Sequence, residues 1–247
     1  MLNRRTVLAA SIATAAAPAR PALAQTSAAG FVRRDGPRLT LDGKPYRFVG
    51  ANLWYAAWIG HEDRLARELD ALASDGVTNL RIAASAELSP LKNSVRPAFH
   101  DQDGRYDEAL LTGLDHALAA ISARGMKAVL YLTNFWEWSG GMAAYLQWTN
   151  GGHYVDANDP AHPWPEFPDF VSGFYRSPEA IARYHAHVRR IVGRVNTVTG
   201  TPYAEDPAIM AWQLANEPRP GGSGAVVDGA LPLFHGWIAS TSRLINT

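Results

Sequence analysis

Four short apolar segments that alternate with segments of helical periodicity constrain the fold more than any other feature of this sequence. The apolar segments are residues 46–52, 78–83, 127–133 and 208–214. Helical patterns follow at residues 62–74, at 107–124, from Ser177 onward and at 231–245. Strands that alternate with helices predict a parallel sheet, and apolar strands of this kind are buried on both sheet faces. The pattern is typical of a doubly wound sheet or of a (β/α)8 barrel.

The residues at the strand ends favour one of these two architectures. Each predicted strand ends with side chains of functional type: Asn52 and Trp54, Arg81, Asn134 and Trp136, and Asn216 and Glu217. In (β/α)8 enzymes the catalytic groups come from several strand ends on one face, whereas a nucleotide-binding sheet needs a glycine-rich turn after its first strand. The segment Gly50-Ala51-Asn52 lacks such a turn. We therefore expect an α/β fold of the TIM (β/α)8 barrel type, with about the first four strand–helix units in this chain.

The composition of two further segments predicts a hairpin and a long connection with a structure of its own. Asp35-Gly36 and Asp42-Gly43 predict the turns of a small hairpin before the first strand. About 40 residues rich in aromatics, glycine and proline separate residue 133 from the helix that Ser177 caps and Pro178 begins. A segment of this length is uncommon as a plain connector.

The first 24 residues have the pattern of an export signal. Arg4-Arg5 precedes an Ala-rich apolar stretch, and Ala22-Leu23-Ala24 fits a small-residue cleavage site. The paired arginines favour the twin-arginine route. A membrane anchor is the weaker alternative, because the apolar stretch is too short to span a bilayer. We expect residues 1–24 to direct a secreted or periplasmic protein that has no membrane association after cleavage.

Composition excludes several classes of function. The formal net charge is zero, so there is no basic surface that would predict a nucleic-acid partner. The absence of cysteine excludes thiolate nucleophiles and cysteine-ligated metals. His185 and His187 lie two positions apart on a predicted helix and so point to different faces. We therefore expect no metal site and no cofactor.

The segment Ala215-Asn216-Glu217-Pro218 carries most of the predicted chemistry. A carboxylate at the end of an apolar strand is partly desolvated, which would raise its pKa as a general acid requires. Pro218 disfavours the helical conformation for the residue before it, so we expect Glu217 to be extended. The alternative is that Asn216 and Glu217 only close a turn.

The chain resembles the mannanase branch of glycoside hydrolase family 5. Four segments carry this resemblance, in the family's order: Gly50–Tyr55, Asn79–Arg81, Thr133–Gly141 and Ala208–Arg219. The third is the most specific, because its Trp-bearing Gly-Gly loop, continued through Tyr145 and Trp148, favours mannanases over the cellulases of the family. Residues 25–247 then resemble the N-terminal half of a barrel-type catalytic domain.

The resemblance implies a role for each strand-end residue. Glu217 would be the acid/base, Asn216 would hold the 2-hydroxyl of the sugar, and Arg81 would lie near the nucleophile. A structural ion pair inside the barrel is the alternative for Arg81. The remaining expected substrate-binding residues are Trp54 and Trp136, as stacking walls or alternatively core residues, together with Asn134 and Arg219, the last on the leaving-group side.

The implied activity is hydrolysis of internal β-1,4-mannosidic linkages in mannan or glucomannan by a retaining, two-glutamate mechanism. The family's nucleophile lies on a later strand, so we expect it beyond Thr247 and expect the chain alone to be inactive. Glu137 is the best in-chain substitute, but the resemblance makes it a loop residue. The alternatives are a related hydrolase acting on another β-glycan, as cellulases do, or an inactive fragment that binds carbohydrate.

Overall fold

A small antiparallel sheet precedes the main body of the protein. The computed structural model describes residues 30–246, so the expected export signal at residues 1–24 lies outside the described residues. Strands β1 (Val32–Asp35), β2 (Arg38–Leu41) and β3 (Lys44–Pro45) pair in that order. Gly36, Asp42 and Gly43 adopt positive φ in the two turns. The predicted hairpin is confirmed, with a third short strand added.

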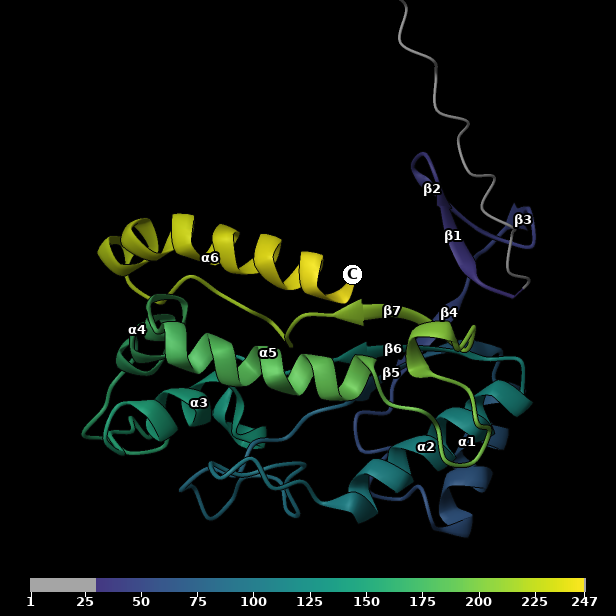
Figure 1. The fold of residues 1–247 in the computed structure, drawn as a ribbon, viewed down its shortest axis with the longest axis horizontal. Coiled ribbons are helices and arrows are strands. Elements are labelled where there is room, and N and C mark those ends of the chain that lie inside the picture. Colours follow the sequence, from purple (N-terminus) through teal and green to yellow (C-terminus); the bar gives the residue numbers. More distant parts are fainter. Residues whose placement is uncertain (1–29, 247) are drawn as a thin grey trace, which may run out of the picture.

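The main sheet has four parallel strands in chain order (Figure 1). They are β4 (Val49–Asn52), β5 (Val77–Ala83), β6 (Lys127–Tyr131) and β7 (Ile209–Gln213). The crossovers run through α1 (Asp63–Ser74), α2 (Glu108–Ala123) and α5 (Pro178–Val192). A strand order that follows the chain without reversal is the progression of a barrel, whereas a doubly wound sheet reverses direction.

Local sequence signals explain where these helices begin and end. The Asp107 carboxylate accepts a hydrogen bond from the Leu110 N–H at 3.0 Å, and the Ser177 hydroxyl accepts one from the Ala180 N–H at 3.2 Å. Gly76 and Gly125 adopt φ of +80° and +66° just after α1 and α2. These are the capping positions that the sequence predicts.

The long segment between β6 and α5 forms its own layer at the carboxyl end of the sheet. It contains η1 (Glu137–Ser139), α3 (Gly141–Thr149), α4 (Glu166–Ser172) and η2 (Gly173–Arg176). A short η3 (Tyr203–Glu205) precedes β7, and α6 (Gly224–Ile245) follows it. Helix α5 packs against both α3 and α6 (Figure 1). None of the helices within residues 30–246 is long and apolar enough to cross a membrane.

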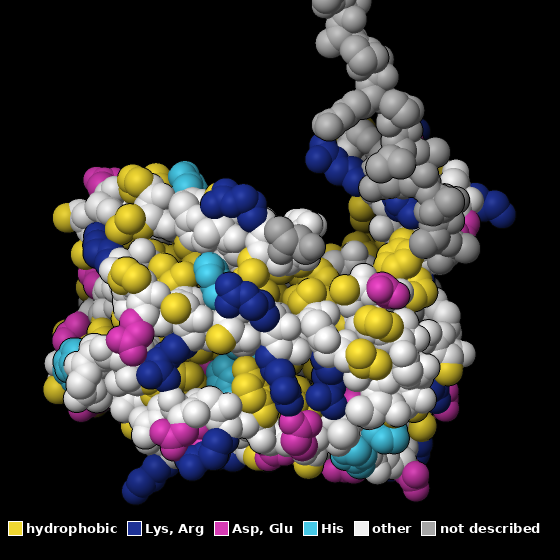
Figure 2. Space-filling view, viewed as in Figure 1, with side chains coloured by type: hydrophobic (Ala, Val, Ile, Leu, Met, Phe, Trp, Pro, Cys, Tyr) yellow, Lys and Arg dark blue, Asp and Glu magenta, His cyan; other side chains and the backbone are white. Residues whose placement is uncertain are grey.

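Two expectations about these elements are wrong. Strand β4 is not buried: within residues 30–246 it pairs with β5 alone, and its first residue, Val49, is 60% exposed. Figure 2 shows hydrophobic side chains at the surface between α6 and the β1–β3 sheet. Helix α6 begins at Gly224 rather than near residue 231. Gly229 and Pro232 are weak helix formers that interrupt its helical periodicity, so the sequence did not predict the first turns of this helix.

Two buried histidines join α5 to the loop after β5. His187 Nε2 lies 3.0 Å from the Ala84 carbonyl oxygen, and its Nδ1 lies 3.2 Å from the Tyr106 hydroxyl. The His100 ring packs edge-on against the His187 ring, with centroids 4.5 Å apart. Burial lowers the pKa of His100 to about 4 and holds the pKa of His187 well below its ordinary value. Both rings are therefore neutral in the folded protein near pH 7.

This pair predicts acid-sensitive stability. As pH falls from about 6.5 toward 4, histidines take up protons in the unfolded state but not in the folded core, so the free energy of unfolding decreases. Each buried ring contributes up to about 1.4 kcal/mol per pH unit in that window. Denaturant unfolding at several pH values measures the slope. His187→Gln should flatten it while exposed His235→Gln should not, and equal slopes in both variants would contradict the assignment.

Candidate active site

A chain of hydrogen bonds joins the carboxyl ends of β5, β6 and β7. The Asn216 amide donates from Nδ2 to Asn134 Oδ1 at 2.9 Å, and Asn216 Oδ1 accepts from Arg81 Nη2 at 2.7 Å. Arg81 Nε donates to Gln213 Oε1 at 2.7 Å. A parallel bridge between Asn134 and Asn216 continues the pairing of β6 with β7. Two of the predicted site residues, Arg81 and Asn134, are therefore joined through a third, Asn216.

Arg81 holds a positive charge at this strand end, and the nearby Glu217 carboxylate favours that charge without forming an ion pair with it. Its guanidinium carbon lies 4.5 Å from the centre of the Tyr131 ring. Burial lowers its pKa, although a guanidinium remains charged at any physiological pH. Across residues 30–246 no Asp or Glu forms an ion pair with it. The alternative role of Arg81, a structural ion pair inside the barrel, is therefore not seen in the described part of the chain.

Glu217 follows Asn216 and projects into solvent. Its Oε2 accepts a hydrogen bond from Trp136 Nε1 at 2.7 Å and lies 3.9 Å from Arg219 Nη2. The side chain is 60% exposed, so the desolvation that we expected from the apolar strand is absent. Its φ is +46°, so the expected extended backbone is also wrong.

The backbone reversal at Glu217 lies between two long-range attachments of the chain. Asn216 is still held in the sheet by its bridge to Asn134. A few residues later, the N–H groups of Gly222 and Ser223 donate to Asp169 Oδ1 on α4, at 2.8 and 2.9 Å. The chain must leave the sheet between these two attachments. Proline disfavours the right-handed helical region for the preceding residue, so the turn uses the left-handed one, a strained conformation that often occurs at functional sites.

The loop after β6 presents Trp136 to Glu217. The backbone N–H of Trp136 donates to Asn134 Oδ1 at 3.0 Å, so this one side-chain oxygen accepts hydrogen bonds from both Trp136 and Asn216. Gly140 and Gly141 close the loop with φ of +87° and +63°. A Cβ on Gly140 would collide with the Glu87 carbonyl, and one on Gly141 would collide with the Asn134 carbonyl. The Gly-Gly pair is thus required by close backbone approach.

Beneath this loop lies Glu87, which sequence analysis missed. Its fully buried carboxyl accepts hydrogen bonds from the Ser85 hydroxyl at 2.6 Å, the Thr133 hydroxyl at 2.8 Å and the Gly141 N–H at 2.8 Å. Burial raises its pKa, and the three donors oppose that shift. The available signal was a glutamate that directly follows the segment Ile82-Ala83-Ala84-Ser85-Ala86, in which all residues but Ser85 are apolar.

The predicted aromatic residues separate into two groups. Trp54 packs against Trp58 and Trp138, with ring centroids 5.6 and 5.3 Å apart, and no ring contact joins it to Trp136 within residues 30–246. Trp136 stacks instead near Phe167 and Trp164. The Arg219 guanidinium lies over the Trp136 ring at 5.0 Å. Trp164, in the proline-rich segment Pro163-Trp164-Pro165, was not predicted.

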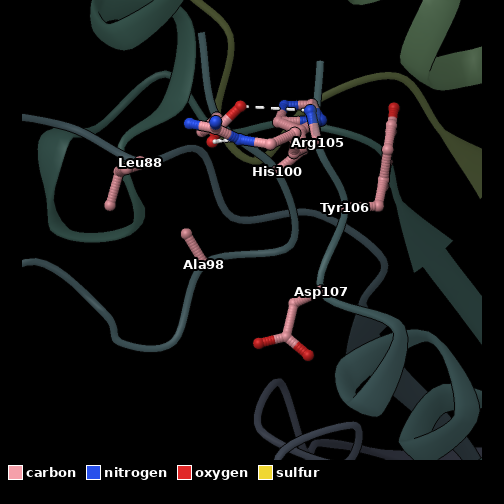
Figure 3. A pocket seen from close by; sticks show the side chains of 7 residues that line it. Leu88, Ala98, His100, Arg105, Tyr106 and Asp107 are labelled. Atoms are coloured by element: carbon pink, nitrogen blue, oxygen red, sulfur yellow. Dashed lines mark hydrogen bonds and ion pairs between the residues drawn. The ribbon is translucent and has the colours of Figure 1, made fainter. Parts of the chain in front are cut away.

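A hollow of about 280 Å³ in the loop after β5 is a separate feature (Figure 3). Its polar side chains are committed to structural partners. Asp101 pairs with Arg105 at 2.8 Å, Asp107 caps α2, and His100 and Tyr106 bond to Tyr145 and His187. None of its lining residues is among the strand-end residues Arg81, Asn134, Asn216 and Glu217. We therefore place the candidate active site at the strand ends.

The two histidines of α5 are engaged in contacts with the protein itself. His185 lies on α5 with its Nε2 3.0 Å from the Thr241 hydroxyl, and His187 faces the core. Within residues 30–246 no group of three or more His, Asp or Glu side chains could hold a metal ion.

Comparison with known proteins identifies the family of this site. A family model described as glycoside hydrolase family 5 β-mannosidase-like matches residues 29–247. The chain is 32% identical over 221 residues to putative mannan endo-1,4-β-mannosidase 4 of Arabidopsis thaliana, covering 88% of this chain and 49% of that protein. It thus spans about half the length of the curated relatives it matches.

Solved structures give the same result. The family 5 mannosidase of Rhizomucor miehei superposes with a TM-score of 0.74 at 32% identity, covering 83% of this chain and 54% of that one. The endo-1,4-β-mannanase of the same organism gives 0.68 at 26% identity, covering 87% and 57%. The predicted barrel class is confirmed: β4 to β7 and their helices are strand–helix units of a (β/α)8 barrel fold.

The Gly-Gly loop yields a prediction with a matched control. Gly141 and Gly200 both adopt positive φ, but only at Gly141 would a Cβ meet other atoms. Gly200→Ala should lose roughly 1–2 kcal/mol of unfolding free energy, the cost of a left-handed alanine. Gly141→Ala should lose roughly a further 1–3 kcal/mol from the clash.

Denaturant unfolding measures both losses. In addition, the indole N–H resonance of Trp136 should shift in Gly141→Ala and stay in place in Gly200→Ala, because only the first substitution displaces the loop. Equal losses with an unmoved resonance would show that the Gly-Gly pair does not position Trp136.

Proposed function

Because the chain belongs to the β-mannosidase-like enzymes of glycoside hydrolase family 5, we propose that it hydrolyses β-1,4-mannosidic linkages by a retaining mechanism, with Glu217 as the acid/base. The single observation that carries this assignment is the hydrogen bond from Trp136 Nε1 to Glu217 Oε2, beside the Arg81–Asn216–Asn134 chain. It supports a carboxyl held in a defined orientation at the face where barrel enzymes carry out chemistry.

The contacts of Glu217 fit proton transfer. An indole N–H only donates, and in a protonated carboxyl the carbonyl oxygen is the better acceptor, so this hydrogen bond favours Oε2 as the oxygen without the proton. Within residues 30–246 both polar contacts of the carboxyl are made by Oε2. The proton of the acid form then belongs on Oε1, which gives it to the leaving oxygen. In the second step the carboxylate takes a proton from the water that attacks the glycosyl-enzyme.

The positions of Arg81 and Asn216 indicate where the second carboxyl of a retaining mechanism, the nucleophile, would lie. Retaining glycosidases hold their two carboxyls about 5–5.5 Å apart. The Arg81 guanidinium forms no ion pair within residues 30–246 and donates to Asn216, the residue next to Glu217. Its charge therefore favours a second carboxylate beside Arg81. We assign no nucleophile within residues 30–246, since none of their carboxyls pairs with Arg81. Asn216 and Asn134 are proposed to contact sugar hydroxyls next to this pair.

Mannan or glucomannan is the proposed substrate, cleaved at internal linkages. The named activities of the Arabidopsis and Rhizomucor relatives support this choice. The second candidate is release of terminal mannose, because the family model is β-mannosidase-like and one similar structure is that of a mannosidase. Arg4-Arg5 and the apolar stretch that follows support export, which suits a polymeric substrate outside the cell.

Glu217→Gln should lower kcat on galactomannan by about 10²–10⁴-fold in the full-length protein, because general acid catalysis is lost. Reducing ends and solution viscosity measure the wild-type activity: an early fall in viscosity indicates internal cleavage, and mannose release without it favours the terminal activity. Glu205→Gln, an exposed carboxyl on η3, is the control and should stay at the wild-type rate.

Glu217→Ala should also slow turnover of aryl β-mannosides less than turnover of polysaccharide, since activated leaving groups need no acid. Azide should accelerate the second step of that variant. Near-wild-type hydrolysis of galactomannan by either Glu217 variant would falsify the acid/base assignment.

A further inference from the structure

Glu87 is a fully buried carboxyl to which the proposed hydrolysis gives no role. It lies in the loop after β5, and within residues 30–246 it forms no ion pair with a Lys, Arg or His side chain. A carboxyl buried without a counter-charge opposes folding unless hydrogen bonds compensate the loss of hydration. A purely structural role would be served as well by an apolar side chain of the same volume. The presence of a carboxyl at this position therefore needs a reason other than packing.

The neighbours of Glu87 favour its carboxylate form. The Gly141 N–H, which can only donate, binds Oε2 at 2.8 Å. The hydroxyls of Ser85 and Thr133 both donate to Oε1, and neither has another partner among the hydrogen bonds of residues 30–246. A proton on Oε1 would leave one of these hydroxyls without an acceptor. Gly141 is also the first residue of α3, and a helix N-terminus favours a negative charge.

The Glu87 carboxylate binds both ends of the loop that carries Trp136. Thr133 lies at the start of this loop and Gly141 at its end, and each donates to a different carboxylate oxygen. In the same loop the Ser139 carbonyl accepts from the Glu87 N–H at 2.9 Å. The loop therefore cannot move relative to the end of β5 without breaking a buried hydrogen bond of Glu87.

We propose that Glu87 is a positioning residue for the acid/base: its carboxylate fixes the loop of residues 133–141 so that the Trp136 indole N–H meets Glu217 Oε2. This inference rests on the proposed function, because it concerns the carboxyl that protonates the leaving oxygen. The indole engages Oε2 and leaves Oε1 for the proton transfer. The Glu217 side chain is 60% exposed, so that without the indole it turns freely in solvent. A misplacement of about 1 Å in a catalytic site costs about 10²-fold in rate.

The test compares three substitutions in the full-length protein. Glu87→Met keeps the length of the side chain and removes both acceptors, whereas Glu87→Gln keeps one oxygen for the Gly141 N–H and an amide group for the two hydroxyls. Asp115→Asn is the matched control. Asp115 is a second fully buried carboxyl, but its partners include Arg194 and Tyr203 and none of them lies in the loop of residues 133–141. Its loss should lower the melting temperature without displacing that loop.

The readout is the ratio of kcat/KM on galactomannan to kcat/KM on 2,4-dinitrophenyl β-mannoside. The activated leaving group needs no proton, so a displaced acid slows only the polysaccharide, whereas a loss of folded protein slows both substrates equally. Glu87→Met should lower the ratio about 10- to 100-fold, and Glu87→Gln should stay within about threefold of the wild type. Asp115→Asn should keep the wild-type ratio. An unchanged ratio in Glu87→Met, an equal fall in Asp115→Asn, or a Glu87→Gln ratio no better than that of Glu87→Met overturns the inference.

A second measurement uses no substrate and separates this inference from the proposed function. The indole N–H resonance of Trp136 should shift in Glu87→Met and keep its position in Glu87→Gln and Asp115→Asn. If the wild type hydrolyses nothing, the proposed function fails, and this resonance still decides whether Glu87 holds Trp136. If Glu87→Met does not fold, Thr133→Val, which frees one end of the loop, replaces it in both measurements, with a ratio lowered roughly 3- to 10-fold. An unmoved resonance in the variant that is measured overturns the inference.

Discussion

The hydrogen bond from Asn216 Nδ2 to Asn134 Oδ1 is the contact on which the rest of the site depends. It joins the ends of β6 and β7, and each asparagine uses its remaining side-chain atom on a different neighbour. Asn216 Oδ1 accepts from Arg81 on β5, and Asn134 Nδ2 donates to the Ser139 hydroxyl in the Trp136 loop. Both amides are buried, and a buried polar group left without a partner costs about 1–3 kcal/mol. The three strand ends are therefore fixed together.

Two attachments outside this chain hold the exposed groups of the site. The Glu87 carboxyl binds the Gly141 N–H from below the loop, and Asp169 binds the loop after β7 from the side of α4. Between them, Trp136 and Glu217 meet across 81 positions of sequence. The carboxyl is exposed while its supports are buried, which is an arrangement suited to a group that must contact a polymer arriving from solvent.

Sequence reasoning predicted what local chemistry determines and missed what long-range contacts determine. The strands follow from hydrophobic periodicity, and the helix starts follow from the capping residues Asp107 and Ser177. The polar residues at the strand ends follow from the position of active sites in (β/α)8 barrels. The positive φ of Glu217 does not, because it arises from Asp169, which binds the next loop from a helix 48 residues earlier in the chain. Glu87 and Trp164 were missed for the same reason. In the sequence, Glu87 resembles an ordinary loop glutamate, and only the fold brings it to Gly141. Trp164 lies in a proline-rich connector, and only the fold brings it to Trp136.

In the proposed retaining mechanism, Glu217 and a second carboxyl beside Arg81 act on opposite sides of one glycosidic bond. The anomeric configuration of the first product tests it most directly. Proton NMR of galactomannan or manno-oligosaccharide hydrolysis, recorded before mutarotation, should show the β-anomer of the new reducing end appearing first. Initial appearance of the α-anomer would mean a single displacement by water, and would contradict the two-step chemistry for which Arg81 and Asn216 are placed.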